Sequence, residues 1–145
     1  MAFNTIMNVG DGIQYEAKAD AAITPGMLVE ELSTGNIQKQ ATAKANVENA
    51  VAIENHLIGE DIADDYATGD NVLYRVYGSG QQALLILKQG ETVAISDSVE
   101  AAGGGEVQKL TSAGTNPVGI ARNAVDANAS TATPLVNRRV IVRFF

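Results

Sequence analysis

The sequence has no cysteine, no tryptophan and a single histidine, His56, among its 145 residues. The absence of cysteine excludes disulfide scaffolds, thiolate zinc sites, iron–sulfur clusters and cysteine nucleophiles. The single histidine excludes every site that needs two imidazoles from one chain. We therefore expect no catalytic residue, no bound metal and no cofactor.

Basic residues and long apolar segments are also scarce. Ten Lys and Arg residues oppose 17 Asp and Glu residues, which gives a formal net charge of −7. Nucleic-acid-binding proteins instead need a basic surface that displaces counterions. The longest apolar run, 83–87, is far shorter than the roughly 20 residues of a membrane-spanning helix. The first residues carry no basic leader before a continuous apolar core, so we expect no signal peptide. Neither nucleic acid nor a membrane is an expected partner.

Short apolar runs, rich in β-branched, aromatic and aliphatic residues, predict a mainly β fold. No segment has a sustained helical stripe of apolar residues, so little helix is expected. Two glycine-containing turns, Ser33–Asn36 and Gly78–Gln81, each lie between two runs and predict two β-hairpins. The expected architecture is a compact domain that resembles a β-barrel or sandwich. The predicted strands are 27–31, 37–40, 72–77, 83–87, 92–95 and 139–145.

Three segments recur in the same order along the chain. The pattern of Val29–Lys39 returns in Val99–Lys109 at an offset of 70 residues. The other two matches pair 49–53 with 116–120 at an offset of 67, and 72–75 with 140–143 at an offset of 68. This order predicts an internal duplication with units at about 23–77 and 95–145, although short β segments also resemble one another by coincidence. Both units belong to one β-rich domain over 21–145.

Residues 1–20 differ in character from the rest. Their apolar residues Phe3, Ile6, Met7 and Val9 have loose spacing and are followed by Gly10-Asp11-Gly12. This segment is either a first strand of the domain or an extended N-terminal arm. An arm would add a strand to a partner through backbone hydrogen bonds, with the four apolar residues as contacts.

Charge is unevenly distributed. Between Lys44 and Arg75 the chain has seven acidic and no basic residues, whereas basic residues dominate after position 121. Opposite charges on separate surfaces can pair between subunits. The candidate intersubunit residues are Arg138, Arg139, Asp64 and Asp65.

The sequence contains few residues in patterns typical of a catalytic site. His56 with Glu54, Glu60 and Asp61 could hold a divalent cation, but neither a zinc-protease helix nor a calcium-loop pattern is present. A solvated acidic loop is the favoured interpretation. Ser79 lacks the flanking glycines of a nucleophile elbow. We predict that the chain is not an enzyme, and a small metal-dependent enzyme at His56 stays as a minor hypothesis.

Five short segments lie along the chain from Ile23 onward: Ile23–Val29, Val51–Ile53, Gly69–Val72, Pro117–Ala121 and Val140–Val142. In this order they resemble the small head-decoration, or cement, proteins of tailed bacteriophages. The resemblance implies a β-rich homotrimer without catalysis, made in the host cytoplasm. It would bind the major capsid protein at three-fold or quasi-three-fold positions on the outer surface of the virion and stabilise the mature head. The alternative is a non-catalytic binding module of a phage tail or fibre.

Overall fold

The computed structural model describes residues 5–111, 116–128 and 138–145, which form thirteen short strands and one 3₁₀-helix. The prediction of a mainly β chain with little helix is confirmed. No helix in these three ranges is long and apolar enough to cross a membrane. The elements are β1 (Met7–Val9), β2 (Ile13–Lys18), β3 (Val29–Glu31), β4 (Ile37–Lys39), β5 (Ala50–Ala52), η1 (His56–Ile58), β6 (Asn71–Val76), β7 (Gln82–Ile86), β8 (Thr92–Val93), β9 (Ser98–Gly103), β10 (Glu106–Lys109), β11 (Pro117–Ala121), β12 (Val125–Asp126) and β13 (Arg139–Phe144).

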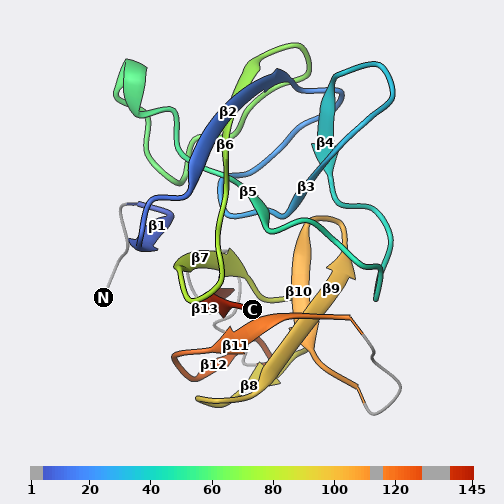
Figure 1. Cartoon of the computed structure of the whole chain (residues 1–145), viewed down its shortest axis with the longest axis vertical. Helices are drawn as coiled ribbons and strands as arrows, with labels where there is room; N and C mark the ends of the chain where they lie inside the picture. Colours follow the sequence, from blue (N-terminus) through green and yellow to red (C-terminus); the bar gives the residue numbers. More distant parts are fainter. Residues whose placement is uncertain (1–4, 112–115, 129–137) are drawn as a thin grey trace.

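The strands form several antiparallel sheets and no closed barrel. The largest sheet has the order β1-β7-β13-β11-β9-β10, and a three-stranded sheet has the order β2-β6-β5. Two smaller sheets pair β3 with β4 and β8 with β12. Figure 1 shows β2–β6 in the upper half of the molecule and β7–β13 in the lower half. The chain therefore divides into an earlier unit, β2–β6, and a later unit, β7–β13.

The two units pair their first and last strands in the same register. In the earlier unit Glu16 of β2 lies opposite Leu73 of β6, and in the later unit Leu84 of β7 lies opposite Ile141 of β13. A shift of 68 residues converts five of the six β2–β6 pairs, from Gln14–Arg75 to Lys18–Asn71, into the five pairs of β7 with β13. Register is set by which side chains must face the core, so an equal register over several pairs indicates the same local architecture.

The hairpins in the middle of each unit are equivalent as well, and the predicted hairpin at β3–β4 is confirmed. Glu30 lies opposite Gln38 in β3–β4, and Glu100 lies opposite Gln108 in β9–β10. Even the side-chain contact recurs, because Gln38 Nε2 donates to Glu30 Oε1 at 2.7 Å and Gln108 Nε2 donates to Glu100 Oε1 at 2.8 Å. The 70-residue match in the sequence therefore marks equivalent hairpins.

The match of 49–53 with 116–120 needs a correction of two residues. Val51 of β5 lies opposite Arg75, whereas Ile120 of β11 lies opposite Arg143. Position 51 thus corresponds to position 120, a shift of 69 where the sequence comparison used 67. The sequence match aligned similar residue types, whereas the strand register shows which residues occupy equivalent positions in the two sheets.

The predicted hairpin between 72–77 and 83–87 is wrong. Strand β6 pairs with β2 and β5, and β7 pairs with β1 and β13. A turn does form between them, since Gln81 N–H donates to Gly78 O at 3.1 Å. This turn is the boundary between the two units. Each flanking strand finds its partners inside its own unit, so the chain passes from one sheet to another.

Two apolar clusters hold the molecule together. The smaller cluster lies within the earlier unit and includes Ile23, Ile37 and Val72. The larger cluster fills the later unit and also takes in Leu73 and Val51 from the earlier one. The two units are consequently packed on a shared core rather than joined only by a linker.

Gly119 offers a test of the contact between β11 and β13. A Cβ atom there would lie 2.2 Å from the backbone oxygen of Arg143 on the paired strand. The Gly119→Ala variant is expected to lose about 1–3 kcal/mol in the free energy of unfolding, because the strands must separate to make room. Gly78→Ala is the control, since its nearest neighbouring atom would lie 3.7 Å away. Urea unfolding measures both, and equal midpoints for the two variants would contradict the close approach.

Candidate interaction surface

The N-terminal segment forms a strand on the outer side of β7. Leu84 N–H donates to Ile6 O at 2.8 Å, and Met7 pairs with Ala83. The carboxylate of Glu54, which is buried, holds this segment by accepting hydrogen bonds from the Thr5 hydroxyl and from the Ile6 N–H at 3.1 Å. Residues 5–9 are thus part of the folded domain in the isolated chain.

The four predicted capsid contacts have different places. Ile6 is 0% exposed and belongs to the larger core cluster. Met7 is partly buried against that cluster, and Val9 is exposed. Phe3 lies outside the described residues. Contact with a capsid stays a prediction for this segment. Among its described residues 5–9, only Val9 is a large apolar side chain with high exposure.

The two candidate intersubunit arginines both have partners within the chain. Arg139 is 5% exposed, and its guanidinium donates to Pro25 O at 2.5 Å and to Ile62 O at 3.1 Å. Burial lowers the pKa of Arg139 to about 10. Arg138 forms an ion pair with Glu106 at 2.7 Å. Pairing either arginine with another subunit would require these contacts to break.

The two candidate acidic partners lie in the exposed loop before β6. Asp64 Oδ2 accepts a hydrogen bond from Asp61 N–H at 2.9 Å, which closes a turn of this loop. Asp65 is exposed, and its charge favours the protonated form of Arg139. Intersubunit pairing of these carboxylates stays a prediction.

The acidic loop around His56 does not gather into a metal site. Glu54 turns inward to bind the N-terminal segment, whereas His56, Leu57 and Ile58 are exposed in η1. Within 5–111, 116–128 and 138–145, no three side chains among His, Asp and Glu are placed to hold a metal ion. The four residues considered together in the sequence are therefore divided between the core and the surface.

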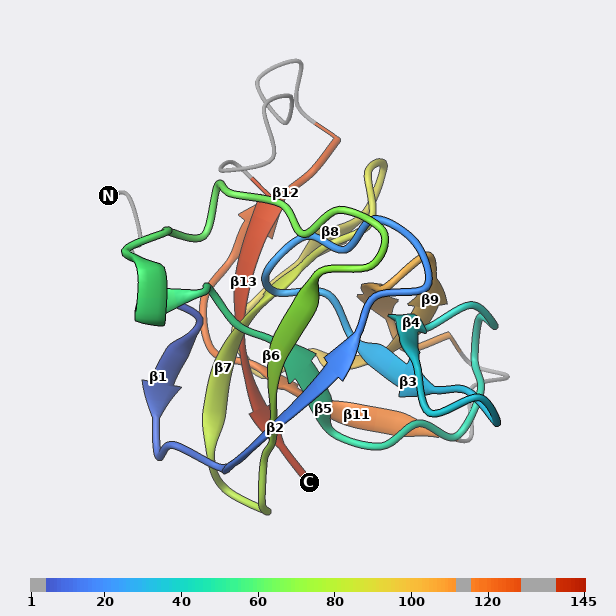
Figure 2. The same ribbon diagram turned by 90° about the horizontal axis from the view of Figure 1, so that it is seen from above.

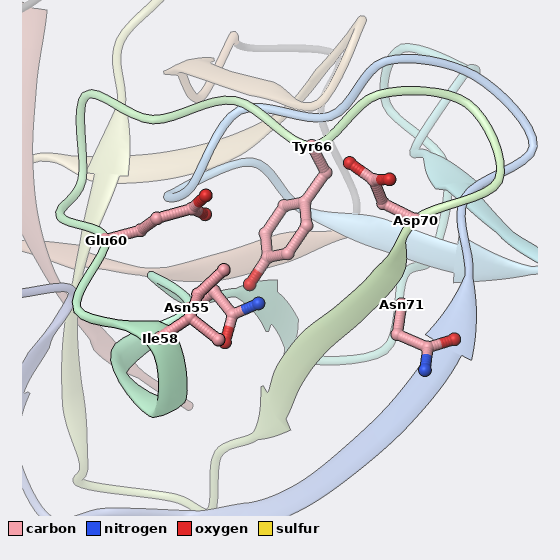
Figure 3. A pocket seen from close by; sticks show the side chains of 6 residues that line it. All are labelled: Asn55, Ile58, Glu60, Tyr66, Asp70 and Asn71. Carbon is pink, nitrogen blue, oxygen red and sulfur yellow. The ribbon is translucent and has the colours of Figure 1, made fainter.

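A cavity of about 290 Å³ lies beside this loop, lined by Asn55, Ile58, Glu60, Tyr66, Asp70 and Asn71. Figure 3 shows the Tyr66 ring between the Glu60 and Asp70 carboxylates. The Tyr66 hydroxyl donates to Ile53 O at 2.8 Å and accepts from Leu73 N–H at 3.4 Å. Burial raises the pKa of Tyr66 to about 12, so the hydroxyl stays protonated at neutral pH. The hydroxyl thus connects the chain at Ile53 with strand β6.

Strand β2 exposes the most regular open sheet edge of the described chain. It pairs with β6 from Ile13 to Lys18 without a break in register, and no described strand pairs with its other side. We call that other side the β2 edge. Ile13 and Tyr15 beside it are 64% and 47% exposed, and the Tyr15 ring stacks on Tyr74 at 5.7 Å. Figure 2 shows β2 in front of β6 and β5. This strand lies inside the predicted N-terminal segment 1–20, although its alternation of Ile, Tyr and Ala with polar residues is typical of a separate strand.

The sequence matches no protein-family model and no curated protein. The fold does have a match among solved structures, the head fiber gp8.5 N base in bacteriophage phi29. The TM-score is 0.59 and the sequence identity 12%, and the alignment covers 92% of this chain and 93% of that one. Over 92% of its length, the chain thus has a fold similar to that of a bacteriophage head fiber base.

Proposed function

We propose that this chain is a structural protein of a bacteriophage virion that binds the outer surface of the head, without catalysis. The observation that carries the proposal is the fold match to a head fiber base, which extends over nearly the whole of both chains. The resemblance of five short sequence segments to those of head-decoration proteins supports the same conclusion. The first line of support uses the path of the backbone, and the second uses residue order.

The physical role would be stabilisation of the mature head. A protein that binds the assembled shell but not its dissociated subunits shifts the equilibrium toward the shell by mass action. A trimer that contacts several shell subunits at once gains avidity without any single strong contact. We therefore propose a homotrimer bound to the major capsid protein. Light scattering on the purified protein, or on complexes released from heads, tests this through a mass three times the chain mass of 15.1 kDa.

The number of copies per particle tests the proposed location. Quantitative mass spectrometry of purified virions would compare this chain with the major shell protein. A ratio that is a simple fraction of one supports a protein that covers the shell. Complete absence from the particle would contradict the proposal.

A second candidate is the base module of a fibre, and the fold match itself favours it because the neighbour is the base of a head fiber. Such a module would occur in a limited number of copies, each joined to a projecting fibre. The copy number separates this candidate from a protein that covers the whole shell. Negative-stain images of virions labelled with an antibody to this chain would show whether the label follows fibres or the head surface.

A further inference from the structure

The β2 edge presents unpaired backbone groups in a known direction. At the end of the strand, Ala19 N–H donates to Asp70 O at 2.9 Å on the β6 side, and Asp20 N–H donates to Ile37 O at 2.8 Å on the opposite side. Successive N–H groups of a strand alternate in direction. The N–H groups of Gln14, Glu16 and Lys18 therefore point away from β6, where no described strand meets them.

The equivalent edge of the later unit is occupied. Under the shift of 68 residues, Glu16 corresponds to Leu84, whose N–H donates to Ile6 O at 2.8 Å. Tyr15 corresponds to Ala83, which pairs with Met7. One copy of this edge thus accepts a short extended segment in the same chain, whereas the other copy is open.

Regularity distinguishes the β2 edge from the other described edges. The three residues of β1 and the four of β10 both contain register shifts. Strand β2 has six residues, no register shift and no proline. Natural proteins usually blunt such edges with bulges, prolines, very short strands or charged side chains, because a flat edge pairs readily with another chain. Of these devices, β2 has only the charged side chains of Glu16 and Lys18. The exposed side chains of Ile13 and Tyr15 add apolar surface for an incoming strand.

The acidic charge of the whole chain favours a basic occupant over a second copy of this chain. Close to the edge the charge is mixed, because Glu16 and Lys18 both lie on the strand and Arg75 Nη2 donates to Gln14 Oε1 at 2.8 Å. Burial, and after it the carboxylates of Glu31 and Glu48, raise the pKa of Tyr74, the ring on which Tyr15 stacks. The whole chain carries a formal charge of −7. Two identical acidic surfaces repel each other, whereas a strand with basic side chains is attracted.

We propose that the β2 edge accepts an extended strand of the shell protein, which adds a fourth strand to the sheet β2-β6-β5. The strand would place an apolar side chain beside Tyr15 and a basic side chain beside Glu16. Backbone hydrogen bonds supply the affinity in this mode, and the alternating side chains supply the specificity. This inference rests on the proposed function, because it names the contact by which the chain binds the head.

The Glu16→Pro variant tests the backbone contact. Proline removes the N–H that points outward but leaves the hydrogen bonds to β6, so an edge strand tolerates it at this position. Binding to heads that lack the protein is measured by cosedimentation and is expected to weaken at least about tenfold, the ratio that corresponds to one lost hydrogen bond. Glu16→Gln is the matched control, since it keeps the N–H and removes only the charge. Its binding should weaken by less than about fivefold, as for an exposed ion pair.

Hydrogen exchange on the wild-type protein gives a second measurement that does not depend on a variant. In the free protein the amide of Glu16 should exchange fast and that of Ala17, which points toward β6, should exchange slowly. On heads, the Glu16 and Lys18 amides should become protected while Ala17 stays unchanged. This comparison decides the question if Glu16→Pro fails to fold.

The possible outcomes separate the proposed function from the β2 contact. Wild-type protein that does not bind heads would overturn the proposed function. Wild-type protein that binds heads without protection of Glu16, or a folded Glu16→Pro variant that binds as tightly as wild type, would overturn the β2 contact alone. Protection of Glu16 in the free protein that rises with its concentration would identify a second copy as the occupant and overturn the assignment to the shell.

Discussion

Replacing Arg139 with alanine is expected to lower the free energy of unfolding by about 3–5 kcal/mol, because two buried carbonyls would each lose a hydrogen bond to a charged group worth about 1.5–3 kcal/mol. These acceptors, Pro25 O and Ile62 O, lie in the earlier unit, whereas Arg139 begins the last strand of the later unit. The side chain therefore ties the two halves together. The surroundings fit it closely, since a Cβ atom on Gly26 would lie only 2.1 Å from Arg139 Nη1.

Arg138→Ala is the matched control for this prediction. The neighbouring side chain pairs with Glu106 and donates to a single backbone carbonyl, Leu87 O at 3.2 Å, in a partly exposed position. The loss of these contacts should lower the free energy of unfolding by about 1–2 kcal/mol. Urea unfolding of both variants gives the comparison. Arg139→Lys should fall between them, because an ammonium keeps the charge but cannot span two carbonyls as a guanidinium does. Equal losses for Arg138→Ala and Arg139→Ala would contradict the role of Arg139 as the tie.

The free energy of unfolding is expected to fall between pH 10 and pH 12 through the buried tyrosines. The pKa of Tyr66 is about 12 in the folded chain against an ordinary value of 10.0 for tyrosine, chiefly because burial disfavours the phenolate. A folded pKa above the unfolded one gives stability that is complete below the unfolded pKa and is lost as the pH rises through the folded one. Two units correspond to about 2–3 kcal/mol for Tyr66. Burial also raises the pKa of Tyr77, which adds to the loss.

Tyr66→Phe isolates this contribution. At pH 8 the variant should be less stable than wild type by about 1 kcal/mol, because Ile53 O loses its donor. Its stability should then fall less steeply with pH, so that the two curves cross at about pH 11 and the variant is the more stable protein at pH 12. The lowered pKa of Arg139 acts in the opposite direction in both proteins and cancels in the comparison. Parallel curves would contradict the burial of the Tyr66 hydroxyl as the cause.

The sequence was sufficient for the features that depend on local pattern. Alternating side chains and a glycine turn define the β3–β4 hairpin, because both its strands and its connection lie within eleven residues, Val29–Lys39. The repeat was visible for the same reason, since equivalent hairpins keep equivalent residues at the turn and at the Glu–Gln pair. The alignment of similar residue types placed β11 two residues away from its observed register, because register depends on partners that are distant in the sequence.

Features that depend on distant partners could not be predicted in the same way. The apolar runs 72–77 and 83–87 have the local pattern of a hairpin, but β6 and β7 each pair with strands of their own unit. The predicted repeat ended its earlier unit at about 77 but began its later unit only at about 95, whereas in the structure β7 begins the later unit. Arg139 was expected at a surface because arginine is seldom buried. Only the folded chain shows that two backbone carbonyls of the earlier unit meet its guanidinium.

The most direct test of the central claim is cryo-electron microscopy of virions that carry the protein, compared with virions from which it has been deleted. We predict that the difference density lies on the outer surface of the head and fits the two stacked units of Figure 1. Density at the head with the same shape in both particles, or a difference confined to the tail, would contradict the assignment to the head surface.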